Sequence, residues 1–351
     1  MKMDGIVAAG RLADACLARH APHTMGWSWG TGVLLYGLAR FAEVAPAPAR
    51  DRYLGAVARF HAGRTPPRID RPDGCAPGLS ALALHRRHAR REGLPAVARI
   101  AGFVEGAPRN RLGCMDHLGT SPWRALIPSS IWVDTLAMAT VFCAQWAGHT
   151  GNARLLDFAA AQPAIYAAHL LDRDADLFRH AYLVGLGRAI PRAPAFWLRG
   201  NGWALFAMVE ILAELPAGHP GVDEVRQLLA RIADAVAARQ RREGAWGTLL
   251  DDGRSPAESS GTALVAYALA RGARGGWLPA SMGDVARRAM RYLIDRVVPW
   301  SKGPRLRGVS AATNPMPGWA YRLVPDPRDA PWGTGALLLA ASEARDAAAS
   351  G

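Results

Sequence analysis

An isolated aspartate in an otherwise apolar run is the strongest candidate for chemistry in this chain. Asp134 lies in the stretch IWVDTLAMATVF, where apolar residues would surround it on almost every face of a helix. Burial without a cationic partner raises the pKa of a carboxyl group, so that it can donate a proton near neutral pH, whereas a helix amino terminus favours the charged form. On these residues alone, a catalytic acid and a structural helix-capping aspartate are equally good interpretations of Asp134.

A second group of polar residues follows further along the chain. His180 comes after a charged loop, in LFRHAY, and Arg199, Asn201 and Trp203 lie together in FWLRGNGW. The planar guanidinium of Arg199 offers paired donors that suit a sugar carboxylate, and a charge-assisted contact of this kind typically contributes about 1.5–3 kcal/mol. Taken alone, a histidine beside aromatic residues is more often a structural group with satisfied hydrogen bonds.

Tryptophan is unusually frequent in this sequence. The chain has 12 Trp against 8 Phe, and many of the Trp stand beside glycine or polar residues, as Trp29 does in GWSWGTG. An indole beside a glycine can form a stacking wall for the apolar face of a sugar ring. Core filling is the better interpretation of any single Trp, whereas the whole set favours carbohydrate binding.

Helical periodicity dominates the elements that must position these residues. Some segments are apolar on almost every face and others are amphipathic, which indicates an inner and an outer ring of helices. About twelve helices would make six pairs, and the absence of a linker favours one domain over residues 1–351. Ser130 and Asn201 stand where amino-terminal caps are expected. We expect helices at about 5–19, 31–44, 49–63, 77–91, 93–105, 131–148, 152–171, 201–215, 221–243, 258–273, 280–298 and 333–347.

The strong positive charge does not by itself indicate a nucleic-acid partner. The formal net charge is +13, but lysine occurs only at Lys2 and Lys302, and the arginines are spread along the chain, often as pairs at helix ends. This distribution is typical of a solvated surface, which we favour over nucleic-acid binding.

Cysteine spacing and the amino terminus bear on the compartment. Cys16, Cys75, Cys114 and Cys143 are widely spaced and form no CxxC or Cys/His pattern, so neither zinc nor a disulfide framework is indicated. Charged residues interrupt the first twenty positions where a signal peptide needs an apolar run, and no apolar stretch reaches membrane-spanning length. The sequence therefore predicts a cytoplasmic protein that does not bind a membrane.

Several motifs together resemble one enzyme family. The segments IWVDTLAMATVF, LFRHAY, FWLRGNGWALFAMVEIL, LLDDGRSPAESSGTALVAYALARG and PWGTGALLLAASE are similar to the successive signatures of glycoside hydrolase families 88 and 105. The order and spacing agree over roughly residues 25–347. The resemblance implies an all-α (α/α)6 barrel and the hydrolysis of Δ4,5-unsaturated uronyl glycosides left by polysaccharide lyases.

The resemblance also implies roles for individual residues. Asp134 would protonate C4 of the C4=C5 enol ether and then activate water for attack at C5, with Asp73, in DGCAPG, as a supporting aspartate that keeps Asp134 protonated. Asp70 is a near competitor of Asp73 in RIDRPDG. The substrate-binding residues implied by the resemblance, together with the aromatic and polar candidates above, are His180, Arg199, Trp203, His117, Trp29 and Asn201. No metal and no organic cofactor are needed for this chemistry.

Two departures from the family pattern leave alternatives open. Leu183 stands where an acidic residue is common, and Leu198 where a small residue precedes RGNGW. These leucines favour a less polar ligand. The second hypothesis, after the unsaturated uronyl hydrolase, is therefore a diverged homologue that acts on another enol ether or glycoside, for example in secondary metabolism. A non-catalytic carbohydrate-binding protein is the third. In each case the expected partner is a small carbohydrate or glycoside, and the sequence makes no prediction of oligomeric state.

Overall fold

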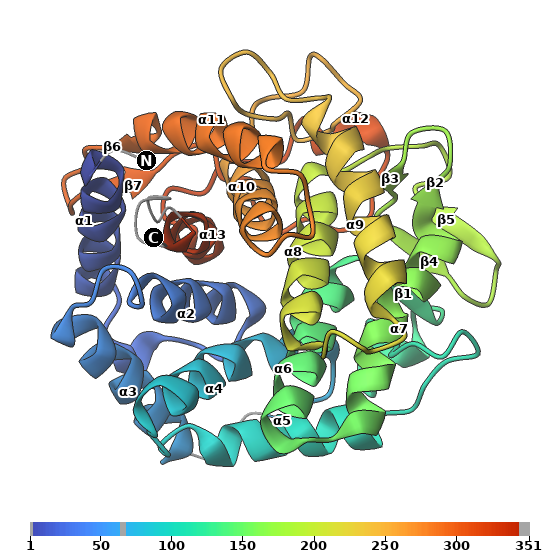
Figure 1. Cartoon of the computed structure of the whole chain (residues 1–351), viewed down its shortest axis with the longest axis horizontal. Helices are drawn as coiled ribbons and strands as arrows, with labels where there is room; N and C mark the ends of the chain where they lie inside the picture. The colour runs from blue at the N-terminus through green and yellow to red at the C-terminus, as the bar shows by residue number, and fades with distance from the viewer. Residues whose placement is uncertain (1–2, 64–67, 344–351) are drawn as a thin grey trace.

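Two concentric rings of helices form the molecule (Figure 1). The structure, a computed structural model, describes residues 3–63 and 68–343. The inner ring of the described chain consists of α2 (Trp29–Phe41), α4 (Ala76–His88), α6 (Val141–Thr150), α8 (Leu198–Glu214), α10 (Ser259–Arg274) and α13 (Pro331–Ser342). The outer ring consists of α1 (Met3–Arg19), α3 (Pro48–Ala62), α5 (Leu94–Gly106), α7 (Ala153–Leu170), α9 (Val222–Ala237) and α11 (Ser281–Asp295).

The inner ring is closed. Each inner helix packs against the next one in chain order, and α13 packs against α2, so that the last inner helix meets the first. Outer helices alternate with inner helices along the chain, which gives six helical hairpins. The predicted (α/α)6 barrel is therefore confirmed.

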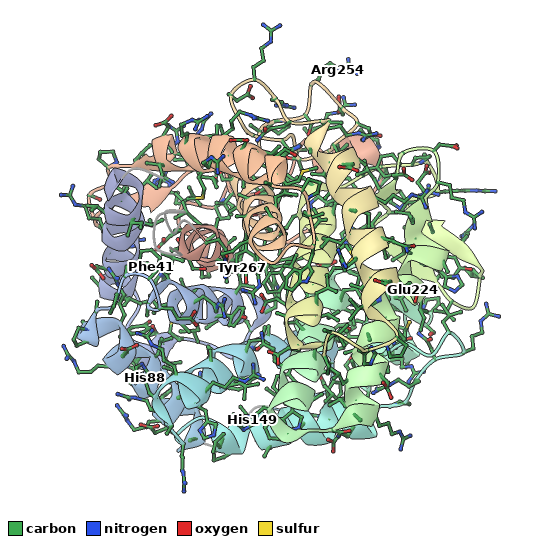
Figure 2. The ribbon with its side chains drawn as sticks, in the orientation of Figure 1. Phe41, His88, His149, Glu224, Arg254 and Tyr267 are labelled. Carbon is green, nitrogen blue, oxygen red and sulfur yellow. The ribbon has the colours of Figure 1, made fainter. Side chains whose placement is uncertain are left out.

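Side-chain pattern explains which helices lie inside. Every residue of α8 from Leu198 to Leu212 is buried, whereas α9 buries one face through Val225, Leu229, Ile232 and Val236. That spacing follows the helical repeat, so α9 covers the barrel and leaves its other face in water. Figure 2 shows Glu224 and Arg254 at the periphery, with Phe41 and Tyr267 in the interior.

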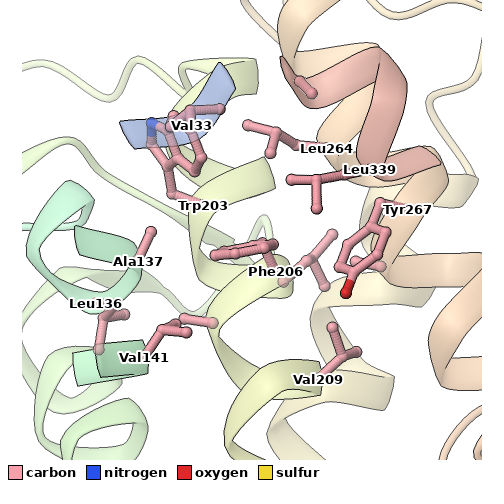
Figure 3. Close-up of a cluster of buried hydrophobic side chains, with 14 of the residues drawn as sticks. Val33, Leu136, Ala137, Val141, Trp203, Phe206, Val209, Leu264, Tyr267 and Leu339 are labelled. Carbon is pink, nitrogen blue, oxygen red and sulfur yellow. The ribbon is translucent and has the colours of Figure 1, made fainter. Parts of the chain in front are cut away.

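Side chains fill the centre of the barrel. Trp203 and Phe206 of α8 pack with apolar residues of neighbouring inner helices (Figure 3). Further along α8, buried Glu210 accepts hydrogen bonds from Tyr36, Gln145 and Tyr267, and lies 2.9 Å from the guanidinium of Arg271. These partners come from three inner helices, α2, α6 and α10, and compensate the buried charge. One contiguous core joins α1 to α13, and a single domain over residues 1–351 stays a prediction.

Short strands lie beside the ring, and residues 131–132, 171 and 297–298, which were expected in helices, are in strands instead. One sheet contains β1 (Ser130–Trp132), β4 (Ala181–Leu183) and β5 (Arg188–Ile190), and another pairs β2 (Leu171–Asp172) with β3 (Leu177–Phe178). A third pairs β6 (Val297–Val298) with β7 (Arg305–Leu306). In the first sheet, Ile131 lies opposite Tyr182, so antiparallel pairing joins the Asp134 segment to the His180 segment.

Two expected helix starts are wrong. Ser130 does not cap a helix, because residues 130–132 pair with β4, and the helical part begins at Asp134, just before the π-helical turn η4 (Leu136–Thr140) that continues into α6. Asn201 does not cap α8, which begins at Leu198. The first prediction is wrong because residues 130–132 form a strand, and the second because residues 198–201 already form the first turn of α8.

Four short helical turns complete the described chain: η1 (Pro22–Thr24), η2 (Pro72–Cys75), η3 (Pro122–Ala125) and α12 (Gly318–Tyr321). No helix within residues 3–63 and 68–343 is long and apolar enough to cross a membrane.

Candidate active site

The predicted site residues lie at the amino-terminal ends of inner helices. Because an outer helix returns the chain between successive inner helices, all inner helices run in the same direction and their amino termini meet at one end of the barrel. Helix amino termini carry partial positive charge and favour anions. The residues at this end are Trp29 in α2, Asp73 in η2 before α4, Asp134 before η4 and α6, Arg199 in α8, Glu258 at the cap of α10 and Trp332 in α13.

Asp134 and His180 form the central pair of this site. His180 Nε2 lies 3.3 Å from Asp134 Oδ2, with the histidine side chain fully buried and the aspartate side chain 17% exposed. Neither atom makes a well-oriented hydrogen bond to any group in the described part of the chain. Buried polar atoms are rarely left in this state except at functional sites, so this pair is the leading candidate for chemistry.

The charge state of the pair differs from the sequence-based expectation. Burial opposes ionisation of Asp134, but the contact with His180 and the nearby His117 and Arg199 outweigh it and lower the pKa of Asp134. Burial lowers the pKa of His180, although Asp134 acts in the opposite direction. The protein's own groups therefore do not give the expected raised pKa of Asp134, and they favour an aspartate anion beside a neutral histidine.

Asp73 has the opposite tendency. Burial raises the pKa of this carboxyl, and the charge of Asp134 adds to the effect, whereas His117 and Arg71 act against it. Its sequence neighbour Asp70 instead lies 3.2 Å from the guanidinium of Arg71. Asp73, and not Asp70, is thus the aspartate that is coupled electrostatically to Asp134.

His117 is brought to the same place by a backbone hydrogen bond and ring stacking. Its backbone N–H donates to Ser130 across 2.9 Å, and its ring stacks on Trp132 with centroids 4.0 Å apart. Its Nδ1 lies 3.1 Å from the hydroxyl oxygen of Thr135, next to Asp134. The structure thereby groups His117, Asp134 and His180 around the end of β1.

The guanidinium of Arg199 is occupied by protein acceptors. Its two terminal nitrogens donate to the carbonyls of Ser310 and Ala311 at 2.8 and 2.7 Å and to the hydroxyls of Ser260, Ser310 and Thr313. Its Nε has no partner among the described residues. Arg199 therefore fastens the segment 310–313 to α8, and only Nε remains for any further contact.

Asn201 is also fully engaged. Its Oδ1 accepts from the backbone N–H of Phe178, and its Nδ2 donates to the carbonyls of Phe178 and Trp197. The side chain is completely buried. Asn201 thus holds β3, two residues before His180.

The two predicted tryptophans differ in exposure. Trp203 is buried against Phe206 and Trp29, with ring centroids 6.1 and 6.5 Å away. Trp29 is only partly buried and lies 4.9 Å from the ring of Trp332. Trp29 and Trp332 are consequently the more accessible pair, and Trp203 supports them from the core.

Two site residues were not singled out from the sequence. Trp197 stacks on His180 with centroids 4.3 Å apart, and the hydroxyl of Tyr321, which also neighbours Trp197, lies 2.7 Å from His180 Nδ1. Trp197 belongs to the FWLRGNGW motif, which was the available signal. Tyr321 belongs to no motif, and only the tertiary structure brings it to the site.

One group of potential metal ligands is present in the described chain. Cys16, His20 and Asp329 offer atoms within 4.8 Å of one another. However, Arg19 binds both carboxylate oxygens of Asp329 at 2.8 Å, and burial, with the charge of Asp329, raises the pKa of the Cys16 thiol to about 12. The group is therefore explained better as an ion pair of Arg19 with Asp329 than as a cation site.

Comparison with known proteins decides the family. The model of Glycosyl Hydrolase Family 88 matches residues 9–347. The chain belongs to this family. An unsaturated rhamnogalacturonyl hydrolase of Bacillus subtilis is 26% identical over 332 residues, which cover 93% of this chain and 91% of that protein. An unsaturated 3S-rhamnoglycuronyl hydrolase of Alteromonas is 30% identical over 216 residues, covering 60% of this chain and half the length of that relative.

Solved structures have the same fold as this family 88 chain. A family 105 glycoside hydrolase of C. acetobutylicum superposes with a TM-score of 0.85 at 22% identity, covering 95% of this chain and 98% of that one. An unsaturated glucuronyl hydrolase of Bacillus sp. GL1 superposes with a TM-score of 0.76 at 17% identity, covering 97% and 96%. At these identities the likeness concerns the barrel alone.

Proposed function

We propose that this family 88 chain hydrolyses Δ4,5-unsaturated uronyl glycosides by adding water across the C4=C5 double bond. The observation that carries the proposal is the contact of Asp134 with His180 at the end of the barrel where six helix amino termini meet. The facing atoms of this pair have no other partner within residues 3–63 and 68–343. The names of the Bacillus and Alteromonas relatives agree with this substrate class.

The reaction needs one group that gives and takes a proton. Asp134 gives its proton to C4, and the ring oxygen stabilises the positive charge that develops at C5. Water then attacks C5 and returns a proton to the Asp134 carboxylate. The product is a hemiketal at C5, which opens and releases the neighbouring sugar or other leaving group. General acid–base catalysis of this kind typically contributes about 10²–10⁴-fold.

Substrate binding supplies the protonated form of Asp134. The protein's own groups favour the ionised form of Asp134, because His180, His117 and Arg199 lower its pKa despite burial. An arriving uronate brings a negative charge and displaces water, and both effects raise the pKa of a neighbouring carboxyl. The bound complex therefore takes up the proton that the first step uses. Arg199 and the helix amino termini attract the uronate carboxylate.

The test uses the ultraviolet absorbance of the unsaturated uronate. The purified chain is incubated with a panel of lyase-generated disaccharides, and the loss of absorbance reports hydration of C4=C5. Asp134→Asn should lower kcat at least about 100-fold while circular dichroism and thermal unfolding stay unchanged. Asp70→Asn is the matched control, because Asp70 pairs with Arg71, and it should retain most of the activity. Undiminished turnover by Asp134→Asn would refute the assignment.

A second candidate function is supported by exposed apolar residues around the site. Except for Val7, the large apolar side chains that are exposed in the described chain lie on three segments: Trp123, Leu126 and Ile127 before β1, Leu186 after β4, and Trp319 and Leu323 around α12. The first two segments join through the hydrogen bond from Val184 to Ser129, and α12 carries Tyr321, which contacts His180. These side chains favour an unsaturated uronide with an apolar leaving group.

This candidate rests on different residues from those named in the sequence. Leu198 is completely buried and packs against Gly261 of α10, so it does not make the site more apolar. Leu183 lies on β4 opposite Ser130 and is half-buried. The second candidate therefore rests on the exposed side chains of segments 122–127 and 318–323 and on Leu186.

The second candidate is tested with two substrates that share the unsaturated uronate. One carries a sugar leaving group and the other a phenyl or alkyl group. Trp319→Ser should lower kcat/KM about tenfold for the apolar substrate alone, since it removes apolar contact area. Val7→Ser, an exposed apolar residue on α1, should change neither value. Preference of the wild-type chain for the sugar substrate, with no effect of Trp319→Ser, would exclude this candidate.

The expected compartment remains a proposal. All four cysteines are free and buried, as in proteins of reducing compartments, and we propose that the chain functions in the cytoplasm. Fractionation of the native cells, with detection by antibody, tests this proposal, and recovery outside the cytoplasmic fraction would contradict it.

A further inference from the structure

The imidazole of His180 is completely buried among aromatic and acidic side chains. Trp197 stacks on one face, Trp132 approaches edge-on with centroids 5.5 Å apart, and Asp134 faces Nε2. The remaining ring nitrogen, Nδ1, lies 2.7 Å from the hydroxyl of Tyr321. His117 and Arg199 are the other charged or titratable groups that act on this ring. Each nitrogen of His180 thus has one facing group.

The hydroxyl of Tyr321 decides where the histidine proton lies. Tyr321 is completely buried, and burial raises the pKa of its phenol, although a backbone hydrogen bond from Met316 acts in the opposite direction. The phenol therefore stays un-ionised, and its O–H can donate a hydrogen bond to Nδ1. A neutral imidazole has one donor and one acceptor nitrogen, so when Nδ1 accepts, Nε2 carries the proton.

We propose that Tyr321 is a positioning residue of the active site, which fixes the Nε2–H form of His180 and so directs a hydrogen-bond donor at Asp134. The tautomer of His180 is inferred from its two contacts, with Tyr321 and with Asp134. The effect of this tautomer on catalysis rests on the proposed function. A donor facing Oδ2 stabilises the carboxylate that results when Asp134 has given its proton to C4. The opposite tautomer would present a lone pair to that carboxylate and repel it.

The position of Tyr321 depends on a long chain segment. Tyr321 ends α12, eight residues after Thr313, and the segment 310–313 is bound to α8 by Arg199. Glu258 also binds the same segment, through the N–H of Ser310 at 2.9 Å. Arg199 and Glu258 therefore act on His180 indirectly, because they dock the segment that leads to Tyr321.

The first test reads the tautomer directly and needs no substrate. Nitrogen-15 NMR of the 10 histidine side chains distinguishes protonated from unprotonated ring nitrogens, and His180→Gln identifies the signals of His180. The wild-type chain at neutral pH should show Nε2 protonated and Nδ1 unprotonated. In Tyr321→Phe, which keeps the ring and removes the hydroxyl, the Nδ1–H form should appear. A wild-type spectrum with Nδ1 protonated, or an unchanged spectrum in Tyr321→Phe, would overturn the proposal.

The second test measures catalysis. Tyr321→Phe should lower kcat about tenfold, the effect of one hydrogen bond, while KM changes less than twofold. The matched control is Tyr53→Phe on α3, whose hydroxyl donates to the backbone carbonyl of His20, and it should leave kcat and the His180 signals unchanged. A wild-type kcat in Tyr321→Phe would contradict the claim that Tyr321 assists catalysis through His180.

The two proposals fail in different ways. If the wild-type chain hydrates no unsaturated uronide, the proposed function fails, and the NMR result still decides whether Tyr321 sets the tautomer. If Asp134→Asn is inactive and Tyr321→Phe retains both the wild-type tautomer and the wild-type kcat, the proposed function survives and the role of Tyr321 is refuted.

Discussion

Asn201 of α8 binds both backbone polar groups of Phe178, accepting from its N–H at 2.8 Å and donating to its carbonyl at 3.0 Å. Phe178 ends β3, and His180 follows two residues later. This side chain therefore connects α8 to the segment that carries His180, and it holds that segment in place relative to the helix.

Replacement of Asn201 should affect both stability and catalysis. Asn201→Ala leaves buried backbone groups of Phe178 and Trp197 without partners, so we expect a loss of about 2–4 kcal/mol in the free energy of unfolding. It should also lower kcat of the folded protein, since His180 loses its support. Urea unfolding and steady-state kinetics check the two effects. Asn152→Ala, which removes the cap of α7, is the control and should lower stability alone. Unchanged kcat in Asn201→Ala would show that His180 is held by other contacts.

The coupling of the two aspartates gives a prediction with a definite sign. The charge of Asp134 contributes to the raised pKa of Asp73. Asp134→Asn removes that charge, and the pKa of Asp73 should therefore decrease. Carbon-13 NMR titration of the side-chain carboxyl groups measures the change, with Asp157→Asn, whose aspartate pairs with His219, as a variant that should have no effect. An unchanged or increased pKa of Asp73 would show that the two carboxyls are not coupled.

Arg199 should behave mainly as an anchor of the segment 310–313. Arg199→Lys keeps the charge but loses the planar set of donors that reaches Ser310, Ala311 and Thr313 together. We expect faster amide hydrogen exchange across residues 308–321 and a decrease in kcat of about tenfold or more. Arg254→Lys, at an exposed position, is the control. If exchange stays at the wild-type rate while KM rises, Arg199 acts directly on the uronate carboxylate instead.

The ion pair of Asp329 should make stability depend on acid pH. Burial opposes ionisation of Asp329, but hydrogen bonds from His20 and Arg19 outweigh it and lower its pKa to about 2. A lowered folded-state pKa stabilises the fold above the unfolded-state pKa of about 3.9, and this contribution is lost as pH falls towards 2. Because the group is partly exposed to solvent, we expect Asp329→Asn to cost only about 1–2 kcal/mol at neutral pH.

Urea unfolding at a series of pH values checks this prediction. The difference between wild type and Asp329→Asn should shrink between about pH 4 and pH 2. Asp284→Asn removes an exposed pair with Arg287 within α11 and should change stability little at any pH. A difference for Asp329→Asn that does not vary with pH would mean that the carboxylate charge contributes nothing.

The helices of the barrel could be predicted because their signals are local. Spacing of apolar residues separates a helix such as α8, buried on all faces, from α9, which buries one face. The small sheets could not be predicted in this way. Strands of two or three residues, such as β1 and β4, carry almost no periodic signal, and their pairing joins residues about fifty positions apart.

The sequence by itself determined the residue types of the site and their places in motifs. Asp134, His180, Arg199 and Asn201 were all named from it, and the alternation of two helix classes indicated a barrel that would collect them at one end. The protonation states that these groups prefer could not be predicted from the sequence. They depend on distances such as the 3.3 Å between Asp134 and His180, because electrostatic interactions in a buried site vary steeply with separation and burial.

Tertiary structure alone decided which groups support the site. Tyr321 reaches His180 across 141 positions of sequence, and the partners of Arg199 in the segment 310–313 lie more than 100 positions away. Only the closed inner ring brings these segments together, since α13 returns to α2 and places the chain before it against α8 and α10. A hydrogen bond depends on position and direction in space, which local sequence patterns do not contain.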